Sequence, residues 1–255
     1  MTGQVEAGAN TGSAHPVWSS VRAVLFDLDG TLLDTVADIT VALNCALAEQ
    51  NLRTLAKGEV RGLIGQGAPA LIERALECFG AAGPAADATL LLERFQHHYE
   101  RIHEHGEIQT RAYRGVAWGL AELYAQGFML AVVTNKPRSI AVELLTRMSL
   151  AQWVQVVVGG DSGLPRKPHP QPLLAACEEL GVPAAQALMV GDSQTDVLAA
   201  RAAGLAAVVC VPYGYNGGAD PRALPCDGII ETIDDLPAML APRAGRLLCA
   251  NAPTE

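Results

Sequence analysis

The chain has 255 residues, half of them apolar, 18% charged, and a formal net charge of −9 at pH 7. This length can bury one substantial core, and the high apolar fraction excludes wholesale disorder. The negative charge argues against a nucleic-acid partner, because phosphate backbones are bound mainly through clustered Lys and Arg. No apolar run approaches the roughly 18 residues that a membrane helix requires, so we expect no membrane partner.

The two ends of the chain and its cysteines indicate where the folded part lies. Residues 1–20 lack the basic start and apolar region of a secretory signal, which predicts a disordered leader and a cytoplasmic protein. Residues 241–255 contain two prolines and a glycine, and we expect a mobile tail there. The six cysteines are scattered without a C-x-x-C pair, so reduced thiols in the core are expected rather than zinc or disulfides.

The first predicted element is a buried strand over Val21–Phe26, and the sequence D-L-D-G-T follows it at 27–31. Ligands of parallel sheets gather beyond the carboxyl ends of the strands. Because successive side chains alternate in direction, Asp27 and Asp29 can converge on one point. Two converging carboxylates repel each other unless a cation relieves them, and Mg²⁺ suits such a site. Alternatively, the segment is an ordinary acidic turn.

The next segment is predicted to be entirely helical. No convincing strand appears between Asp34 and Gln109, and this block of about 75 residues is therefore expected to be an insert rather than part of the sheet. Four histidines lie near its end without an acidic or cysteine ligand set, which favours a solvated helix face over a transition-metal site. The predicted helices are Asp38–Gln50, Gly58–Ile64, Ala68–Phe79 and Ala88–Ile102, and the histidines are His97, His98, His103 and His105.

From Val116 onward, helices alternate with apolar strands, which is typical of a doubly wound α/β fold. The predicted strands are Phe128–Val133, Val154–Val158, Ala187–Val190, Ala207–Val211 and Gly228–Ile230. The predicted helices are Ala117–Gln126, Arg138–Met148, Gln171–Leu180, Thr195–Ala203 and Asp235–Leu240.

Polar residues follow three of these strands, and each has two interpretations. Thr134 and Asn135 precede a predicted helix, where they form either an anion site or a plain helix cap. Lys167 is either a cation that neutralises phosphate or a solvated surface lysine. Asp192 and Asp196 supply a second pair of carboxylates, although Gly-Asp is common in turns and Asp196 could complement a helix dipole. Together with the loop at 27–31 these make four polar loops, each after an apolar strand, and the combination favours the functional interpretation.

In this order the residues resemble the four motifs of the haloacid dehalogenase superfamily, specifically its phosphatase branch. The resemblance spans roughly Val21–Leu240, and the second acid of the first motif points to phosphoryl transfer rather than dehalogenation. The matching segments are 27–31, Thr134-Asn135, Lys167-Pro168, and Gly191-Asp192 with Asp196.

The resemblance implies a role for each matching residue. Asp27 would be the nucleophile and Asp29 the general acid and base. Thr134, Asn135 and Lys167 would bind the phosphate. Magnesium would be held by Asp27, the backbone carbonyl of Asp29, and Asp192, with support from Gly30, Thr31 and Asp196.

The helical insert lies at the position of the C1 cap of this superfamily. Its segment 61–67 resembles the I-G-x-G stretch of bacterial phosphoglycolate phosphatases, as do 133–137, 159–170 and 213–218. Gly65 and Gly67 would let the cap backbone approach a small substrate, and Arg61 or Lys57 could meet its carboxylate. Alternatively, these glycines only separate two cap helices.

The sequence therefore predicts an α/β fold, with a Rossmann-like doubly wound parallel sheet as core (21–34 and 110–240) and an inserted all-helical C1 cap (35–109). The expected activity is Mg²⁺-dependent hydrolysis of 2-phosphoglycolate through an aspartyl-phosphate. Alternatives are another small phosphomonoester as substrate, such as a sugar phosphate or nucleotide, a phosphomutase, or a non-catalytic scaffold. The expected partner is a small-molecule phosphomonoester, and the expected state is a monomer or homodimer.

Overall fold

The protein is described by a computed structural model that covers residues 18–80, 86–106, 108–217 and 219–241. Its core is a six-stranded sheet in the order β5-β4-β1-β6-β7-β8, and every neighbouring pair is parallel. The six predicted strands are confirmed with small differences at their ends. They are β1 (Ala23–Phe26), β4 (Met129–Val133), β5 (Val156–Val158), β6 (Ala187–Gly191), β7 (Ala207–Cys210) and β8 (Gly228–Ile229).

The central strand β1 is buried on both faces, as a continuous apolar run predicts. Val24 and Phe26 pack into one hydrophobic cluster, whereas Ala23 and Leu25 pack into another on the opposite face. Phe26 pairs with a valine of β4 on one side and with Val190 of β6 on the other. The carboxyl ends of these three strands are therefore level, and the loops that follow them open at one edge of the sheet.

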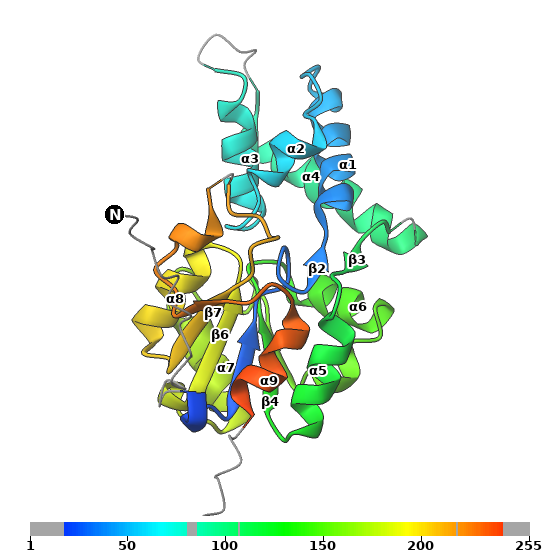
Figure 1. Ribbon diagram of the computed structural model, residues 1–255. Helices are drawn as coiled ribbons and strands as arrows, with labels where there is room; N and C mark the ends of the chain where they lie inside the picture. Colours follow the sequence, from blue (N-terminus) through cyan, green and yellow to red (C-terminus); the bar gives the residue numbers. More distant parts are fainter. Residues whose placement is uncertain (1–17, 81–85, 107, 218, 242–255) are drawn as a thin grey trace, which may run out of the picture.

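Helices cover both faces of the sheet and complete a three-layer α/β/α core (Figure 1). The cluster on one face includes residues of α5, α6 and α9, and the cluster on the other includes residues of α7 and α8. The predicted Rossmann-like doubly wound fold is confirmed. These helices are α5 (Val116–Ala125), α6 (Arg138–Arg147), α7 (Gln171–Leu180), α8 (Gln194–Ala203) and α9 (Leu236–Leu240).

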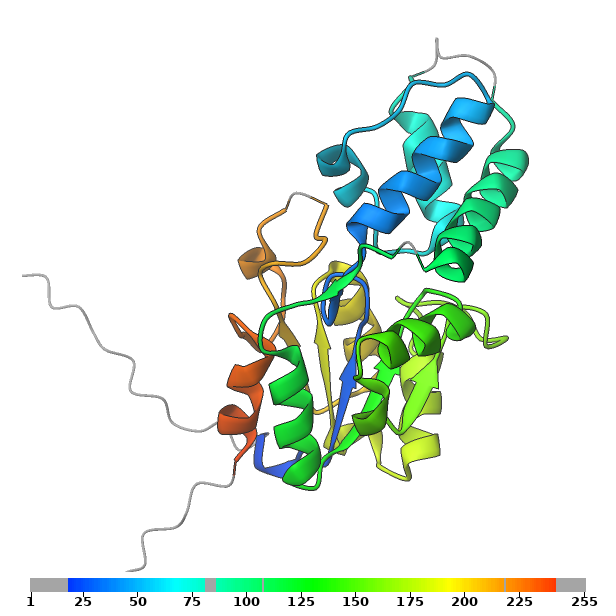
Figure 2. The same cartoon turned by 90° about the vertical axis from the view of Figure 1, so that its right-hand side faces the viewer.

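A second group of helices stands beyond the carboxyl edge of the sheet (Figures 1 and 2). They share a hydrophobic cluster of their own, which Tyr215 of the core also joins. The described part of 35–109 contains no strand, as the sequence predicts. We refer to this group as the helical cap; it comprises α1 (Val36–Glu49), α2 (Lys57–Arg61), α3 (Ala68–Glu77) and α4 (Ala88–His105).

The chain enters and leaves the helical cap through a short antiparallel ribbon of β2 (Leu33–Asp34) and β3 (Arg111–Ala112). The sequence does not predict this ribbon, because two residues are too few to display an alternating pattern. Asp38 in the first turn of α1 strengthens the junction. Its buried carboxylate accepts hydrogen bonds from the backbone N–H groups of Gln109 and Thr110, at 2.8 and 3.0 Å.

Some expectations about the ends and the cysteines need correction. Trp18–Ser20, placed in the leader, form a turn of 3-10 helix, while 1–17 and 242–255 lie outside the described residues. Cys177 and Cys210 are buried, but Cys45 and Cys78 are exposed, so the expectation of core thiols is wrong for these two. No described helix is both long and apolar enough to cross a membrane.

His103 also differs from expectation, because it is buried rather than solvated. Its imidazole Nδ1 lies 3.2 Å from Oε2 of Glu143, and its backbone carbonyl accepts a hydrogen bond of 2.9 Å from Arg147. Glu143 and Arg147 belong to α6, so this contact joins the helical cap to the core. Burial lowers the pKa of His103, and the nearby Glu143 carboxylate offsets this only in part.

We expect this histidine to make stability depend on pH. A group whose pKa is lowered by folding costs stability as the pH falls through its unfolded value, near 6.5, because the unfolded chain then binds the proton more tightly. His103→Asn keeps an amide near the Nδ1 position and cannot titrate. The difference in Tm between wild type and this variant should therefore shrink between pH 7.5 and pH 5.5. A difference that stays constant with pH would contradict the assignment.

Candidate active site

Three buried carboxylates meet at the carboxyl edge of the sheet. Asp27 follows β1, Asp192 follows β6, and Asp196 lies in the first turn of α8. One oxygen atom from each lies within 4.8 Å of the others. Loops far apart in the sequence thus converge as the strand register requires, and the interpretation of 27–31 as an ordinary turn does not account for this.

Lys167 places one ammonium group between two of these carboxylates. Its Nζ lies 2.7 Å from Asp27 Oδ1 and 2.7 Å from Asp196 Oδ1, and the residue is only 3% exposed. The interpretation of Lys167 as a surface lysine is therefore wrong. Asn135 holds the lysine in place, because its side-chain amide donates to the Lys167 carbonyl and accepts from the Lys167 backbone N–H, both at 3.0 Å.

The charges of this cluster do not balance. Burial raises the pKa of Asp27 to about 7. The Lys167 ammonium lowers this pKa, but the neighbouring carboxylates of Asp196 and Asp29 raise it. Burial, Asp27 and Asp196 raise the pKa of Asp192 as well. Burial disfavours the charged form of Lys167, but Asp196 and Asp27 outweigh it and raise its pKa. One ammonium thus faces three carboxylates, and a divalent cation would relieve the remaining repulsion.

The loops around Asp192 and Asp196 are closely fitted. The Tyr215 backbone N–H donates to Asp192 Oδ2, and a Cβ at Gly30, where φ is +94°, would collide with the same carboxylate. Thr31 Oγ1 lies 3.5 Å from Asp192 Oδ1. Asp196 Oδ2 accepts from the Ser193 hydroxyl at 2.7 Å and from the backbone N–H of Asp192 at 3.3 Å. Both Asp196 oxygens are held by short contacts of 2.7 Å, to Lys167 and Ser193, whereas Asp192 Oδ1 has only the 3.5 Å contact with Thr31 among the described residues, so Asp192 is the freer of the two to hold a metal.

Asp29 lies apart from the three-carboxylate cluster and faces the helical cap. Its Oδ1 accepts a 2.7 Å hydrogen bond from Thr35, and its Oδ2 lies 3.0 Å from Nζ of Lys136. Lys136 is buried, and its ammonium lies 4.9 Å from the centroid of the Tyr99 ring on α4. No role for Lys136 was predicted from the sequence. Its position after Thr134 and Asn135, at the end of a buried strand, is the signal that could have found it.

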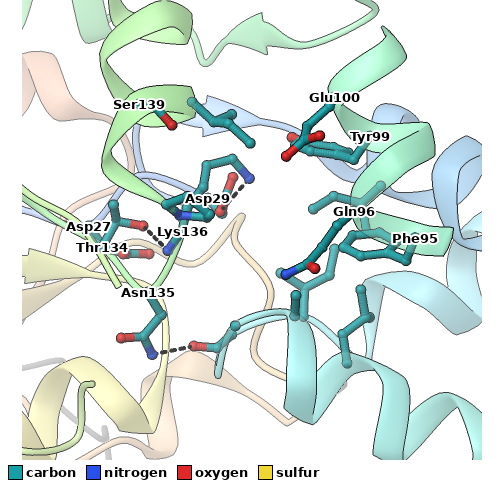
Figure 3. A pocket seen from close by; sticks show the side chains of 18 residues that line it. Asp27, Asp29, Phe95, Gln96, Tyr99, Glu100, Thr134, Asn135, Lys136 and Ser139 are labelled. Atoms are coloured by element: carbon teal, nitrogen blue, oxygen red, sulfur yellow. Dashed lines mark hydrogen bonds and ion pairs between the residues drawn. The ribbon is translucent and has the colours of Figure 1, made fainter. Parts of the chain in front are cut away.

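A cavity of about 130 Å³ lies between the core and the helical cap (Figure 3). Thr134 and Asn135 line it from the core, and Gly65 and Gly67 line it from the cap. Helix α6 begins only at Arg138, so Thr134 and Asn135 are not its N-cap. The full lining is Asp27, Asp29, Ile39, Ile64, Gly65, Gly67, Ala68, Leu71, Phe95, Gln96, Tyr99, Glu100, Thr134, Asn135, Lys136, Pro137, Ser139 and Ile140.

Arg61 is not among the residues that line this cavity. Its guanidinium donates to the backbone carbonyls of Tyr213 and Gly214 and lies 5.1 Å from the centroid of the Tyr215 ring. These contacts join α2 to the loop after β7. Lys57 does not line the cavity either, and the predicted contact of Arg61 or Lys57 with a substrate carboxylate stays a prediction.

Comparison with known proteins agrees with this arrangement. Residues 24–210 match the haloacid dehalogenase-like hydrolase family. The chain belongs to this family. The resemblance predicted from the four motifs is therefore confirmed, and the matched segment runs from β1 through the helical cap to the end of β7.

Several curated proteins with similar sequences are named phosphoglycolate phosphatase. A phosphoglycolate phosphatase of Cupriavidus necator is 47% identical over 220 residues, covering 86% of this chain and 93% of its own. One from Nitrosospira multiformis is 44% identical, covering 84% and 92%. The crystal structure of a predicted phosphoglycolate phosphatase from Haemophilus somnus superposes with a TM-score of 0.80 at 33% identity, covering 87% of this chain and 99% of that one.

The buried Lys167 generates a prediction about stability. Lys167→Met should lower the free energy of unfolding of the metal-free protein by about 3 to 5 kcal/mol at pH 8, because it leaves buried carboxylates without their counter-ion. Urea unfolding followed by circular dichroism measures this change. The matched control is Lys57→Met, at an exposed lysine of α2, which should change stability by less than about 0.5 kcal/mol. Equal effects of the two substitutions would contradict the assignment.

Proposed function

We propose that this hydrolase converts 2-phosphoglycolate to glycolate and phosphate through an aspartyl-phosphate intermediate, with Mg²⁺ as cofactor. The observation that carries the proposal is the match, over most of both chains, to phosphoglycolate phosphatases at 47% and 44% identity. The arrangement of Asp27, Lys167 and Asp192 at the carboxyl edge of the sheet supports it independently.

Asp27 is proposed as the nucleophile. One of its carboxylate oxygens attacks phosphorus in line with the ester oxygen, so that a bond from phosphorus to Asp27 forms as the ester bond breaks. The Lys167 ammonium, 2.7 Å from Asp27 Oδ1, favours the ionised form that this attack requires. Water then attacks the same phosphorus, which releases phosphate and restores Asp27.

Asp29 is proposed as the general acid and base. It gives a proton to the departing oxygen of glycolate and later takes one from the attacking water, so its protonation state is restored over the cycle. Thr35 and Lys136 hold its two carboxylate oxygens. This fixes the direction of the acid while leaving it at the wall of the cavity.

Thr134, Asn135 and Lys167 are proposed to bind the phosphate. The Thr134 hydroxyl and the Lys167 ammonium offer hydrogen-bond donors, and the Asn135 side chain fixes the segment that carries Lys167. Charge that spreads onto the equatorial phosphate oxygens in the transition state is stabilised by donors that are already in place. These residues belong to the loops after β4 and β5.

The donor set fits Mg²⁺. The negative charge of the buried carboxylates, Asp27 and Asp192 among them, exceeds the single positive charge of Lys167. Hard carboxylate oxygens are the ligands that Mg²⁺ prefers. We propose Asp27, the Asp29 carbonyl and Asp192 as protein ligands, with Gly30, Thr31 and Asp196 as supports. When bound, Mg²⁺ would neutralise charge on the transferring phosphate.

The helical cap is proposed to select the leaving group. Gly65 and Gly67 place cap backbone at the wall of the cavity, where a side chain would take up space. Apolar residues of the cap exclude water from the reacting groups. The confined volume, about 130 Å³, suits a small leaving group such as glycolate.

Phosphate release with Mg²⁺ across a panel of phosphomonoesters tests the proposed substrate. The value of kcat/KM for 2-phosphoglycolate should exceed those for sugar phosphates, nucleotides and aryl phosphates by about tenfold or more. A sugar phosphate in the lead would retain the mechanism and overturn the substrate. Interconversion of sugar phosphate isomers would indicate a phosphomutase, and inactivity on every ester would indicate a binding or scaffold protein.

The same assay tests the nucleophile. Asp27→Asn keeps the size of the side chain and should reduce turnover of every ester by a factor of about 1,000 or more, because a neutral amide cannot form the covalent intermediate. Circular dichroism checks that the variant is folded. Substantial activity in a folded Asp27→Asn protein would show that another group attacks phosphorus.

Metal binding should weaken as the pH falls. Because the pKa of Asp27 is raised to about 7 in the metal-free protein, protons compete with Mg²⁺ below that pH and the apparent Kd increases. Isothermal titration calorimetry at pH 6 and pH 8 measures the change. Repeating the titration in two buffers of different ionisation heat counts the protons released. An affinity independent of pH, with no proton release, would contradict the proposed ligand role of Asp27.

A further inference from the structure

We propose that Lys136 of the core and Tyr99 of the helical cap bind the carboxylate of the substrate's leaving group. The inference deepens the proposed function and rests on it. Its starting point is the charge of the cavity wall, where Lys136 is the only Lys or Arg among the described residues that line the cavity. The ionisable acids of the same wall are Asp27, Asp29 and Glu100. A carboxylate that enters this space therefore has one cation to meet.

Other cations lie near the cavity without lining it. The Lys167 ammonium contacts Asp27 and Asp196 and is assigned to the phosphate. Arg61 donates to two backbone carbonyls at the junction between cap and core. Arg166, beside Gly67, donates to the Gly160 carbonyl. Lys136 differs from these three, because it lines the cavity and its ammonium, which has three donors, has one carboxylate partner, Asp29.

Distance along the substrate makes Lys136 the fitting partner. The general acid must lie within hydrogen-bond reach of the ester oxygen that it protonates, about 3 Å away. In 2-phosphoglycolate a single methylene separates this oxygen from the carboxylate. Since Nζ of Lys136 lies 3.0 Å from the Asp29 carboxylate, an ester oxygen held at Asp29 brings the substrate carboxylate within reach of that ammonium.

Tyr99 supplies a second donor from the helical cap. The residue is 4% exposed and lines the cavity. Its hydroxyl has the Lys136 ammonium as an electrostatic neighbour but donates its own proton to no acceptor among the described residues. A buried hydroxyl proton without an acceptor is costly, and a carboxylate oxygen in the cavity would accept it. Burial raises the pKa of Tyr99 to about 12, so the group remains a donor at neutral pH.

The two residues approach the cavity from different parts of the fold (Figure 3). Lys136 follows β4 of the core, and Tyr99 lies on α4 of the helical cap. The ammonium lies 4.9 Å from the centroid of the Tyr99 ring, so they are neighbours when the cap covers the site. Recognition of the carboxylate would thereby depend on cap and core coming together around the substrate.

A pair of substrates separates this role from a role in orienting Asp29. Ethyl phosphate has the same two-carbon chain as 2-phosphoglycolate but ends in a methyl group in place of the carboxylate. Lys136→Met should lower kcat/KM for both esters through its contact with Asp29, and should lower the value for 2-phosphoglycolate by about 50-fold more, as loss of a charge-assisted contact predicts. Arg22→Met, at an exposed arginine before β1 and outside the cavity, is the control and should leave both values unchanged.

Tyr99→Phe provides a second test that removes one oxygen atom and no charge. It should lower kcat/KM for 2-phosphoglycolate about fivefold more than for ethyl phosphate, mainly through an increase in KM. This variant carries the test if Lys136→Met does not fold. Equal losses on the two esters in both variants would overturn the proposal and leave Lys136 as a positioning residue for Asp29.

Failure of the proposed function has a different signature. A wild-type protein that does not prefer 2-phosphoglycolate over ethyl phosphate has no carboxylate selectivity to explain, whatever the variants do. A wild-type preference that survives both substitutions refutes only the assignment to Lys136 and Tyr99.

Discussion

The structure of the site depends on the pairing of a buried ammonium with carboxylates from separate loops. Lys167 reaches Asp27 and Asp196 at 2.7 Å each, inside a region where an isolated charge would be strongly disfavoured. Asn135 fixes the backbone of that lysine, and Ser193 fixes Asp196. The loops after β1, β4, β5 and β6 are consequently held as one unit. After this pairing the cluster still carries more negative than positive charge, which supports the proposed Mg²⁺ site.

A second pairing connects this unit to the helical cap. Asp29 and Lys136 form an ion pair of 3.0 Å at the wall of the cavity, and the lysine lies against Tyr99 of α4. Farther along α4, His103 contacts Glu143 of α6. At the ribbon of β2 and β3, the Asp38 carboxylate joins the start of the cap to its end. Polar contacts therefore join the cap to the core at each of these places, and apolar packing adds to them where Tyr215 of the core enters the hydrophobic cluster of the cap.

Local pattern was enough to predict the elements of this protein. Val21–Phe26 and the other apolar runs appear as strands, and each predicted helix is present with small changes at its ends. Environments of single side chains were harder to predict. His103 lies in a charged segment yet is buried, and Cys45 is exposed although apolar residues surround it in the sequence. Such outcomes depend on which helix face packs against a neighbour, and a single sequence pattern leaves that choice open when the face is mixed.

The sequence by itself determined the family, the succession of strands and helices along the chain, and the residues of the four motif loops. These follow from local spacing and residue type. Only the tertiary structure decided how they meet. Parallel register brings Asp27 level with Asp192 and Asp196, and folding of the cap over the core sets Tyr99 beside Lys136. Arg61 was directed to the junction rather than to the cavity by carbonyls that lie more than 150 positions away in the chain. Such contacts join distant segments, and their distances are fixed by packing that no local pattern encodes.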